Sequence, residues 1–291
     1  MAKTKKRGLL LALILPAFLV YFLFEFIPMI GTFVFSFFEW NGIFGVAPEF
    51  VGLQNFRDLV SDPDVQLAFK NIIWFVLGSI AIHIPLGLLL ASLLASGCRG
   101  MKAFKAIYFM PNIFPLTAVA LLWYFIYFPN NGLLNAVLSA IGLENLTHAW
   151  LIDSTTALGA VIVVNGWVST GFFMTILFAG MMQIPENLYE AAKVDGANAL
   201  QRFFHITVPS LKNVIKTCLI LDLTGTMKVF DLVFAMTNGG PNGLTHLPTT
   251  LMYSESFKYD HYGLGSAIAV AIIIISLLAT LLSMVLLRDK D

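Results

Sequence analysis

Long runs of apolar residues alternate with short polar connections along the whole chain. Six of these runs are each close to the about 20 residues that an α-helix needs to cross a bilayer. They cover residues 9–30, 71–94, 106–128, 157–181, 214–236 and 264–287. The pattern predicts an all-α integral membrane protein with six transmembrane helices, folded as one domain over residues 1–291.

Composition agrees with this prediction, because 58% of the 291 residues are hydrophobic and only 12% are charged. A soluble chain carries about twice that charged fraction. The basic residues before the first run are typical of a signal peptide, but the run is too long and no small-residue cleavage site follows it, so we expect a retained span. Cys98 and Cys218 lie far apart in the sequence, and we expect both to act as small apolar residues.

The basic residues also predict the orientation. Thirteen of the seventeen Lys and Arg residues fall on the two tails, on the connection between the second and third runs, and on the segment after the fourth run together with the start of the fifth run. Lys and Arg accumulate on the cytoplasmic side of membrane proteins. Both termini and the segment 185–209 are therefore expected in the cytoplasm of a prokaryotic cell, at its inner membrane.

The segment 185–209, PENLYEAAKVDGANALQRFFHITVP, is the one long polar stretch with helical order. Pro185 suits a helix start, and Gly196 suits the left-handed conformation that ends a helix. A loop lying on the membrane surface would give a similar pattern. Such helices favour a Lys/Arg-rich face, however, whereas the first helix here is acidic and carries a smooth Ala191–Ala192 patch that another protein could approach.

This segment resembles the "EAA" loop of the permeases of binding-protein-dependent ABC importers. The resemblance rests on Glu190-Ala191-Ala192, on Gly196 and on Ile206-Thr207-Val208-Pro209, where Val208 replaces the usual Leu. In that family the loop forms a coupling helix that docks into a cytoplasmic ATPase. The resemblance implies that the ATPase-coupling residues are Glu190, Ala191, Ala192, Asp195, Gly196 and Pro209.

Two further stretches resemble the carbohydrate class of these importers, namely residues 52–56 and the turn cluster 237–241. The resemblance implies a sugar or oligosaccharide as substrate, with a polyol or glycerol phosphate as an alternative. It also implies four kinds of partner: a second homologous permease, two ATPase subunits that bind ATP and magnesium, an extracytoplasmic solute-binding protein, and membrane lipid. This chain itself would need no cofactor and bind no nucleic acid.

Polar residues inside the apolar runs are the candidates for a substrate path, because each is costly in a membrane unless it faces protein or water. Two stripes stand out, one in the fourth run and one in the fifth. A sugar needs amide, carboxylate and hydroxyl partners and an aromatic face. The alternative, left open by the sequence, is that these groups join helices. The candidate path residues are Asn165, Gly166, Ser169, Phe172, Asp222, Gly225 and Thr226.

Three other features have mainly structural interpretations. His83 and Glu25 are lone polar groups, expected to be satisfied by structural contacts rather than to relay protons. Lys228 and Asp231 are three residues apart and are expected to neutralise each other. Pro111 and Pro115 must bend the third run or free backbone carbonyls within it.

Motifs for catalysis are absent from the sequence. It has no phosphate-binding G-x-x-x-x-G-K-[ST] loop and neither H-E-x-x-H nor G-x-S-x-G, so it is not expected to be an enzyme or to hydrolyse ATP. A secondary transporter remains the less favoured alternative, because such proteins more often have longer chains with repeated halves and broken helices.

Overall fold

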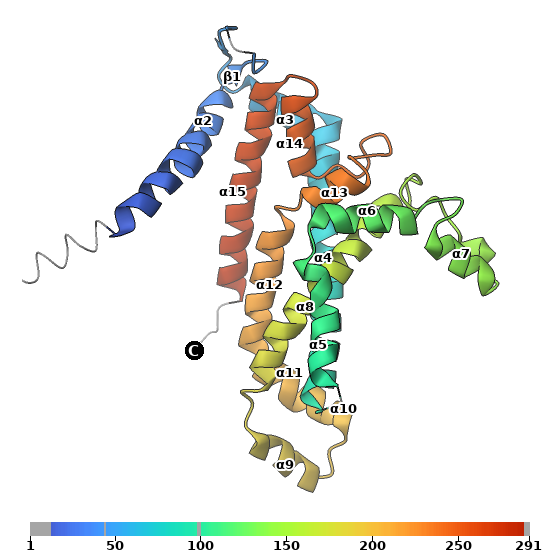
Figure 1. Cartoon of the computed structure of the whole chain (residues 1–291). Helices are drawn as coiled ribbons and strands as arrows, with labels where there is room; N and C mark the ends of the chain where they lie inside the picture. Colours follow the sequence, from blue (N-terminus) through green and yellow to red (C-terminus); the bar gives the residue numbers. More distant parts are fainter. Residues whose placement is uncertain (1–12, 44, 98–99, 288–291) are drawn as a thin grey trace, which may run out of the picture. The chain divides into compact units, whose positions relative to one another are not determined.

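The computed structural model describes residues 13–43, 45–97 and 100–287, and these residues are mainly helical. The predicted all-α class is confirmed, with one short β-ribbon added (Figure 1). In chain order the elements are η1 (Phe22–Phe26), α2 (Ile27–Phe35), β1 (Phe38–Glu39), β2 (Glu49–Phe50), α3 (Gln54–Ser61), α4 (Pro63–Ala95), α5 (Met101–Phe109), η2 (Met110–Ile113), α6 (Leu116–Ile126), α7 (Leu133–Ala140), η3 (Glu144–Leu146), α8 (Ala157–Met181), α9 (Glu186–Val194), α10 (Ala199–Arg202), η4 (Phe203–Thr207), α11 (Val208–Ser210), α12 (Lys212–Thr226), α13 (Asp231–Met236), α14 (Pro248–Phe257) and α15 (Tyr262–Leu286).

The chain forms two compact units. The first comprises residues 1–66 and 251–274, and the second comprises residues 67–250 and 275–291. Helices α4, α14 and α15 run from one unit into the other along the chain.

The first unit begins with a long apolar helix and then forms the β-ribbon. Strands β1 and β2 pair antiparallel, with Phe38 opposite Phe50. The buried side chain of Asn55, at the start of α3, donates hydrogen bonds to the carbonyls of Ser36 at 3.0 Å and Phe38 at 2.9 Å. These two bonds occupy backbone acceptors where the chain leaves the first helix, and they attach α3 to the ribbon.

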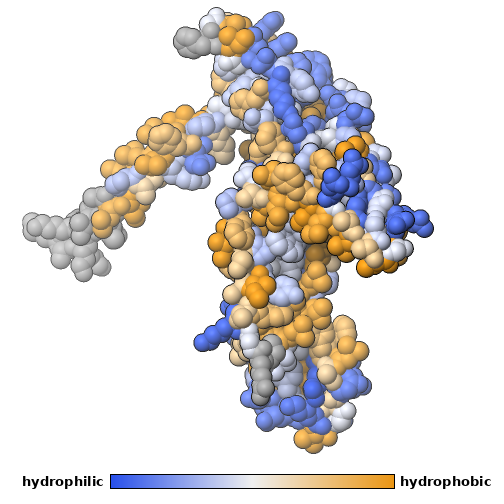
Figure 2. Space-filling view, turned by 45° about the vertical axis from the view of Figure 1, so that its right-hand side comes forward, coloured by the Kyte–Doolittle hydropathy of each residue, from blue (hydrophilic) through white to orange (hydrophobic). Residues whose placement is uncertain are grey.

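The second unit has two apolar clusters, which follow each other along the lengths of α4 and α8. The first gathers buried residues of α4, α6, α8 and α13 around Phe75, Val164 and Leu232. The second gathers residues of α4, α8 and α12 around Leu94 and Met174. In Figure 1 the loop carrying α9 and α10 lies at the lower end of this unit, and Figure 2 shows hydrophilic side chains gathered at that end.

Four described helices are long and apolar enough to cross a membrane: Leu13–Phe35, Pro63–Ala95, Ala157–Met181 and Tyr262–Leu286. The third predicted run instead forms a bent pair, Met101–Ile113 and Leu116–Ile126, with 98° between its two parts. The bend lies at Pro111 and Pro115, as the sequence predicts. Pro115 is the residue before α6, where its missing N–H leaves no helical bond unmade.

The prediction of a continuous helix over 214–236 is wrong. Helix α12 ends at Thr226 and α13 begins only at Asp231. The hydroxyl of Thr249 donates to the carbonyl of Val229 at 2.6 Å, so a distant side chain satisfies backbone in the gap. Because the helix stops before Lys228, this residue and Asp231 do not share a helical face, and the predicted ion pair is not formed among the described residues.

Gly171 allows α8 to approach α5 closely, since a Cβ there would overlap the carbonyl of Tyr108. We expect Gly171→Ala to lower the free energy of unfolding by about 1–3 kcal/mol, because overpacking forces the two helices apart. The measurement is the thermal melting of the purified protein in detergent. Gly159→Ala is the matched control on the same helix, because a Cβ at Gly159 would meet nothing within 4 Å; equal melting temperatures for the two variants would contradict the prediction.

Candidate functional site

The segment 185–209 contains α9, α10, η4 and the start of α11, and the rest of the described chain leaves its first helix uncovered. None of the residues of α9 is buried, and its apolar side chains Leu188 and Val194 are 45% and 86% exposed. Pro185 is the residue before α9, in an extended conformation, as expected for a helix start. An exposed helix with apolar side chains and an adjacent Ala191–Ala192 pair is suited to contact another protein.

Gly196 ends α9 with a left-handed turn, as the sequence predicts. Its φ is +80°. The N–H of Gly196 donates to the carbonyl of Lys193 at 3.1 Å, and the N–H of Ala197 donates to that of Ala192 at 2.9 Å. This pair of bonds is the Schellman motif, which satisfies carbonyls at a helix end. The chain therefore reverses at Gly196 through a defined turn, immediately after Asp195.

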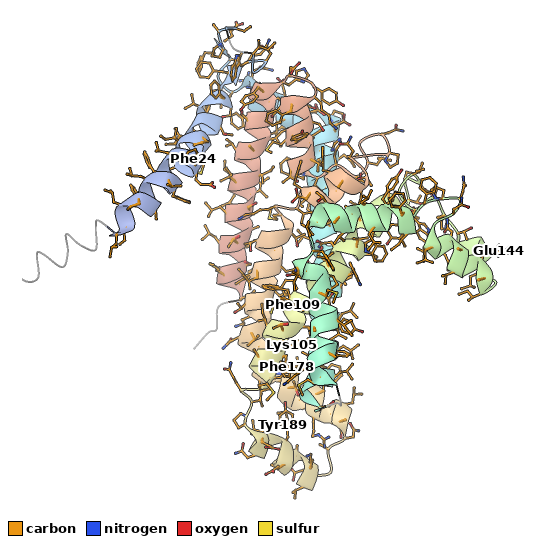
Figure 3. All side chains as sticks on the ribbon, viewed as in Figure 1. Phe24, Lys105, Phe109, Glu144, Phe178 and Tyr189 are labelled. Atoms are coloured by element: carbon orange, nitrogen blue, oxygen red, sulfur yellow. The ribbon has the colours of Figure 1, made fainter. Side chains whose placement is uncertain are left out.

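The second helix of the segment has its own cap. The side chain of Asn198 accepts from the N–H of Gln201 at 2.9 Å, and the Gln201 side chain accepts from the N–H of Asn198 at 2.8 Å. Tyr189 lies on α9 (Figure 3). Its hydroxyl is hydrogen-bonded to that of Thr207 at 2.9 Å, which ties α9 to η4. Pro209 lies in α11, at the start of the return into the membrane-spanning part. The segment is therefore held as one folded piece.

The turn and the second helix enclose an open hollow of about 360 Å³. Its walls combine the small residues Ala192 and Gly196 with the acidic Asp195 and the basic Arg202. Arg202 already donates to the carbonyl of Ala197 at 3.1 Å, so it stiffens the wall. Three of the six predicted coupling residues, Ala192, Asp195 and Gly196, thus line this hollow. Glu190 and Ala191 are exposed on α9, and Pro209 lies on α11.

A second site lies inside the second unit, between its two apolar clusters. His83 on α4 is 1% exposed, and its Nδ1 lies 3.0 Å from both carboxylate oxygens of Asp222 on α12. Its Nε2 lies 3.2 Å from the carbonyl oxygen of Asn165 on α8. The amide of Asn165 donates to Ser79 at 2.9 Å, and the hydroxyl of Thr226 donates to Asp222 at 2.9 Å. We call these five residues the polar cluster.

The geometry of His83 restricts its protonation. The carbonyl of Asn165 can only accept, so Nε2 must carry a hydrogen. On the other side of the ring, Nδ1 faces both carboxylate oxygens of Asp222, so a hydrogen bond joins these two side chains. Buried polar groups are tolerated when they are fully paired in this way.

The structure separates the predicted path residues into two groups. Asn165, Asp222 and Thr226 are buried in the polar cluster, and Gly166 is packed against Ile82. The others are more open: Ser169 is half-buried and has no hydrogen bond among the described residues, Phe172 is 37% exposed, and Gly225 is exposed on α12.

Sequence reasoning missed Ser79 as a member of the polar cluster and treated His83 as a lone group. The expectation that His83 is satisfied by structural contacts is confirmed. Ser79 and His83 are four residues apart in the second apolar run. This is the spacing that singled out Asn165 with Ser169 and Asp222 with Thr226, so it could have identified them.

Removing one partner of the His83–Asp222 pair should destabilise the protein strongly. We expect Asp222→Ala to lower the free energy of unfolding by about 3–5 kcal/mol, because it leaves a buried donor unpaired. The double variant with His83→Ala should cost less than the sum of the single variants, since the two residues share one interaction. Thermal melting of the four proteins measures this.

Thr224→Ala is the matched control on α12. Its hydroxyl donates only to carbonyls of its own helix, those of Ile220 and Leu221. A small effect is expected there. Additive costs for His83→Ala and Asp222→Ala would contradict the pairing.

Comparison with known proteins places these features in context. Residues 83–289 match the family model described as "Binding-protein-dependent transport system inner membrane component". A probable ABC transporter permease protein of Bacillus subtilis, YurN, is 38% identical over 268 residues, which is 91% of each chain. The trehalose/maltose transport system permease protein MalF of Thermococcus litoralis is 32% identical over 269 residues, covering 92% of this chain and 90% of its own.

The fold also matches a solved structure over nearly its whole length. That structure is a bacterial alginate ABC transporter in complex with an alginate pentasaccharide-bound periplasmic protein. One of its chains superposes with a TM-score of 0.85 at 25% sequence identity, covering 99% of this chain and 96% of that one. The similarity therefore extends through both units of the chain.

Proposed function

Because this chain belongs to the family of binding-protein-dependent transport system inner membrane components, we propose that it is the membrane subunit of an ATP-driven importer for a sugar or oligosaccharide. The proposed partners are a second homologous permease, two cytoplasmic ATPase subunits and an extracytoplasmic binding protein. ATP and magnesium bind to the ATPases, and this chain performs no hydrolysis. The trehalose/maltose permease and the alginate transporter support a carbohydrate as the substrate.

The observation that carries the proposal is the doubly capped segment 185–209 with its uncovered first helix. Its first helix has no buried residue, yet the Gly196 turn, the Asn198 cap and the Tyr189–Thr207 bond hold it in one shape. Because this segment is exposed and holds one shape, it is suited to transmit a displacement from the ATPases to the helices that it joins. Closure of the ATPases moves this loop as a lever and changes the path from cytoplasm-facing to outward-facing.

For the substrate path we propose the open side of α8 and α12. Ser169 and Phe172 are three residues apart and share one face of α8, so a free hydroxyl and an aromatic ring lie together. Gly225 adds exposed backbone, and no described residue lies within 4 Å of the place where its Cβ would be. These groups suit the hydroxyls and the C–H face of a sugar, while Asn165, Asp222 and Thr226 support them from the buried side.

Gly196→Pro tests the lever. Proline fixes φ near −65° and has no N–H, so it excludes both the +80° turn and the bond to Lys193. We expect the importer, reconstituted in vesicles with its binding protein and ATPases, to lose at least about 90% of ATP-dependent sugar uptake, because disturbed docking uncouples it from ATP hydrolysis. The exposed position predicts that the variant protein still inserts at normal levels.

Gly142→Pro is the matched control, because Gly142 has a similar φ of +78° at the end of α7, away from the segment. Normal uptake by Gly196→Pro would refute the lever. Wild-type uptake that continues without ATP while ion gradients are maintained would refute the ATP-driven importer and favour a secondary transporter.

The orientation is tested by labelling a single cysteine. In a Cys98→Ser background, where the remaining Cys218 is buried, Asn198→Cys should react with a membrane-impermeant thiol reagent only after the cytoplasmic face is opened. Asn131→Cys, in the connection between α6 and α7, should react in intact cells. Labelling of Asn198→Cys from outside would invert the topology and remove the coupling role of the segment.

A further inference from the structure

Helix α7, in the second unit, carries a stripe of large aliphatic side chains on its surface. Leu133, Val137 and Ile141 are 62%, 48% and 63% exposed. They are four residues apart and therefore share one face of the helix, with Ile141 at its C-terminal end. Contiguous exposed apolar side chains mark contact surfaces rather than ordinary water-exposed helices. We call these three residues the aliphatic stripe.

The opposite face of α7 is fixed by hydrogen bonds. Asn135 is 8% exposed, and its amide donates to the carbonyls of Pro129 and His148, both at 2.9 Å. Its side-chain oxygen accepts from the indole N–H of Trp150 at 2.7 Å. With about 3.6 residues per turn, Asn135 and Val137 point about 160° apart. The polar side of the helix is thus held by its own connection, and the aliphatic stripe points away from it.

These bonds place α7 at one end of the membrane-spanning helices. Pro129 lies three residues after the end of α6, and Trp150 lies seven residues before the start of α8. The ring of Tyr127 packs against Trp150 with centroids 6.1 Å apart, and its hydroxyl donates at 3.4 Å to the carbonyl of Ala160 in the first turn of α8. Tyr and Trp are enriched where helices enter a bilayer. Helix α7 therefore lies level with the membrane surface, at the end of α8 opposite the segment 185–209.

Helices α6 and α7 together form an uncharged extension that projects sideways (Figure 1). Helix α6 is turned by 98° from the helical part before it, so it runs across the direction of α5. No Asp, Glu, Lys, Arg or His occurs between Lys105 and Glu144, and Glu144 lies at the far end of the extension (Figure 3). Leu121 and Phe125 of α6 are 57% and 60% exposed. Both helices thus present apolar side chains outward without a charge among them.

Lipid is the occupant that these features select. An apolar helix face level with the bilayer surface suits the boundary between headgroups and acyl chains. A binding protein that associates and dissociates would leave the aliphatic stripe in water at every departure, and such interfaces are no more apolar than the rest of a protein surface. Contacts between membrane helices rely on small or hydrogen-bonding residues, whereas the stripe consists of large aliphatic ones.

We propose that α7 lies in the plane of the membrane with Leu133, Val137 and Ile141 inserted among the lipid acyl chains, in the leaflet opposite the segment 185–209. Because α7 has no Lys or Arg, apolar burial supplies the attraction and the charge of the lipid headgroups does not. The helix anchors the connection between α6 and α8 to the bilayer. The proposed function assigns no role to α7, and the lipid contact holds whatever solute is carried.

The test places a fluorophore on the aliphatic stripe. In the Cys98→Ser background, Val137→Cys is labelled, and the importer with its second permease and ATPases is reconstituted in phosphatidylcholine vesicles with plain or brominated acyl chains. Bromine quenches only on close approach, so a side chain about 5–10 Å below the headgroups should lose at least about half of its fluorescence in the brominated vesicles. Leu133→Cys should give the same result, which covers a failure of either variant to assemble.

Ser139→Cys is the matched control, because Ser139 is exposed on the same helix and points about 160° away from Val137. Its quenching should be clearly weaker than that of Val137→Cys, and equal quenching would overturn the proposed orientation. Absence of quenching at both stripe positions would overturn the lipid contact. In that case an emission typical of water would leave the stripe in solvent, and a blue-shifted emission would assign it to a neighbouring protein.

The binding protein provides the last comparison. Adding it to the same vesicles should leave the quenching of Val137→Cys unchanged, because lipid covers the stripe throughout. Quenching that disappears when the binding protein is added would overturn the proposal and assign the stripe to that protein.

Discussion

The hydrogen bonds of His83 hold together the three helices on which the second unit depends. One nitrogen reaches Asp222 on α12 and the other reaches the backbone of α8, so a single ring from α4 fixes both. Apolar packing above and below the ring is not directional, and helices packed only by such contacts can slide or rotate. A buried ring that is hydrogen-bonded at both nitrogens, at fixed distances, fixes the register of these helices. The two apolar clusters then pack on either side of these hydrogen bonds.

The hydrogen bonds of His83 also affect the segment 185–209, because α8 leads into the segment and α12 leads out of it. Asn165 lies sixteen residues before the end of α8, and Asp222 lies ten residues after the start of α12. At 1.5 Å per residue these distances are about 24 and 15 Å. The two arms that carry the segment are thus joined to each other well inside the membrane-spanning part. A displacement of the segment reaches both helices together rather than either one alone.

The sequence predicts those features that local chemistry decides. The bounds of α9 are predictable because each depends on a single residue. Pro185 suits the start, where a backbone N–H is not needed, and Gly196 suits the end, where the backbone turns left-handed. The span 157–181 is found at its observed bounds because its flanks are polar. The bend at Pro111 and Pro115 follows from the missing N–H of proline. The partner of His83 could not be found in this way, because Asp222 lies 139 residues farther along the chain.

The break between Thr226 and Asp231 was missed for the same reason. Hydropathy reports that the residues there are apolar enough for a bilayer, but it does not report whether the backbone continues as a helix. The hydroxyl of Thr249, twenty residues farther on, satisfies the carbonyl of Val229 in the gap. The candidate path is similar: the spacing predicts which polar residues share a helix face, whereas packing decides which of them are covered. Asp222 and Gly225 are three residues apart, and one is buried and the other open.

The interrupted fifth span has a consequence for the membrane around it. Helix α12 contains 15 residues and therefore rises about 22 Å, which is less than the about 30 Å of a hydrocarbon core. The remaining depth is crossed by non-helical backbone, whose polar groups lipid cannot solvate. Protein or water must therefore lie between residues 227–230 and the acyl chains. The lipid around this subunit is consequently not a continuous ring at this depth.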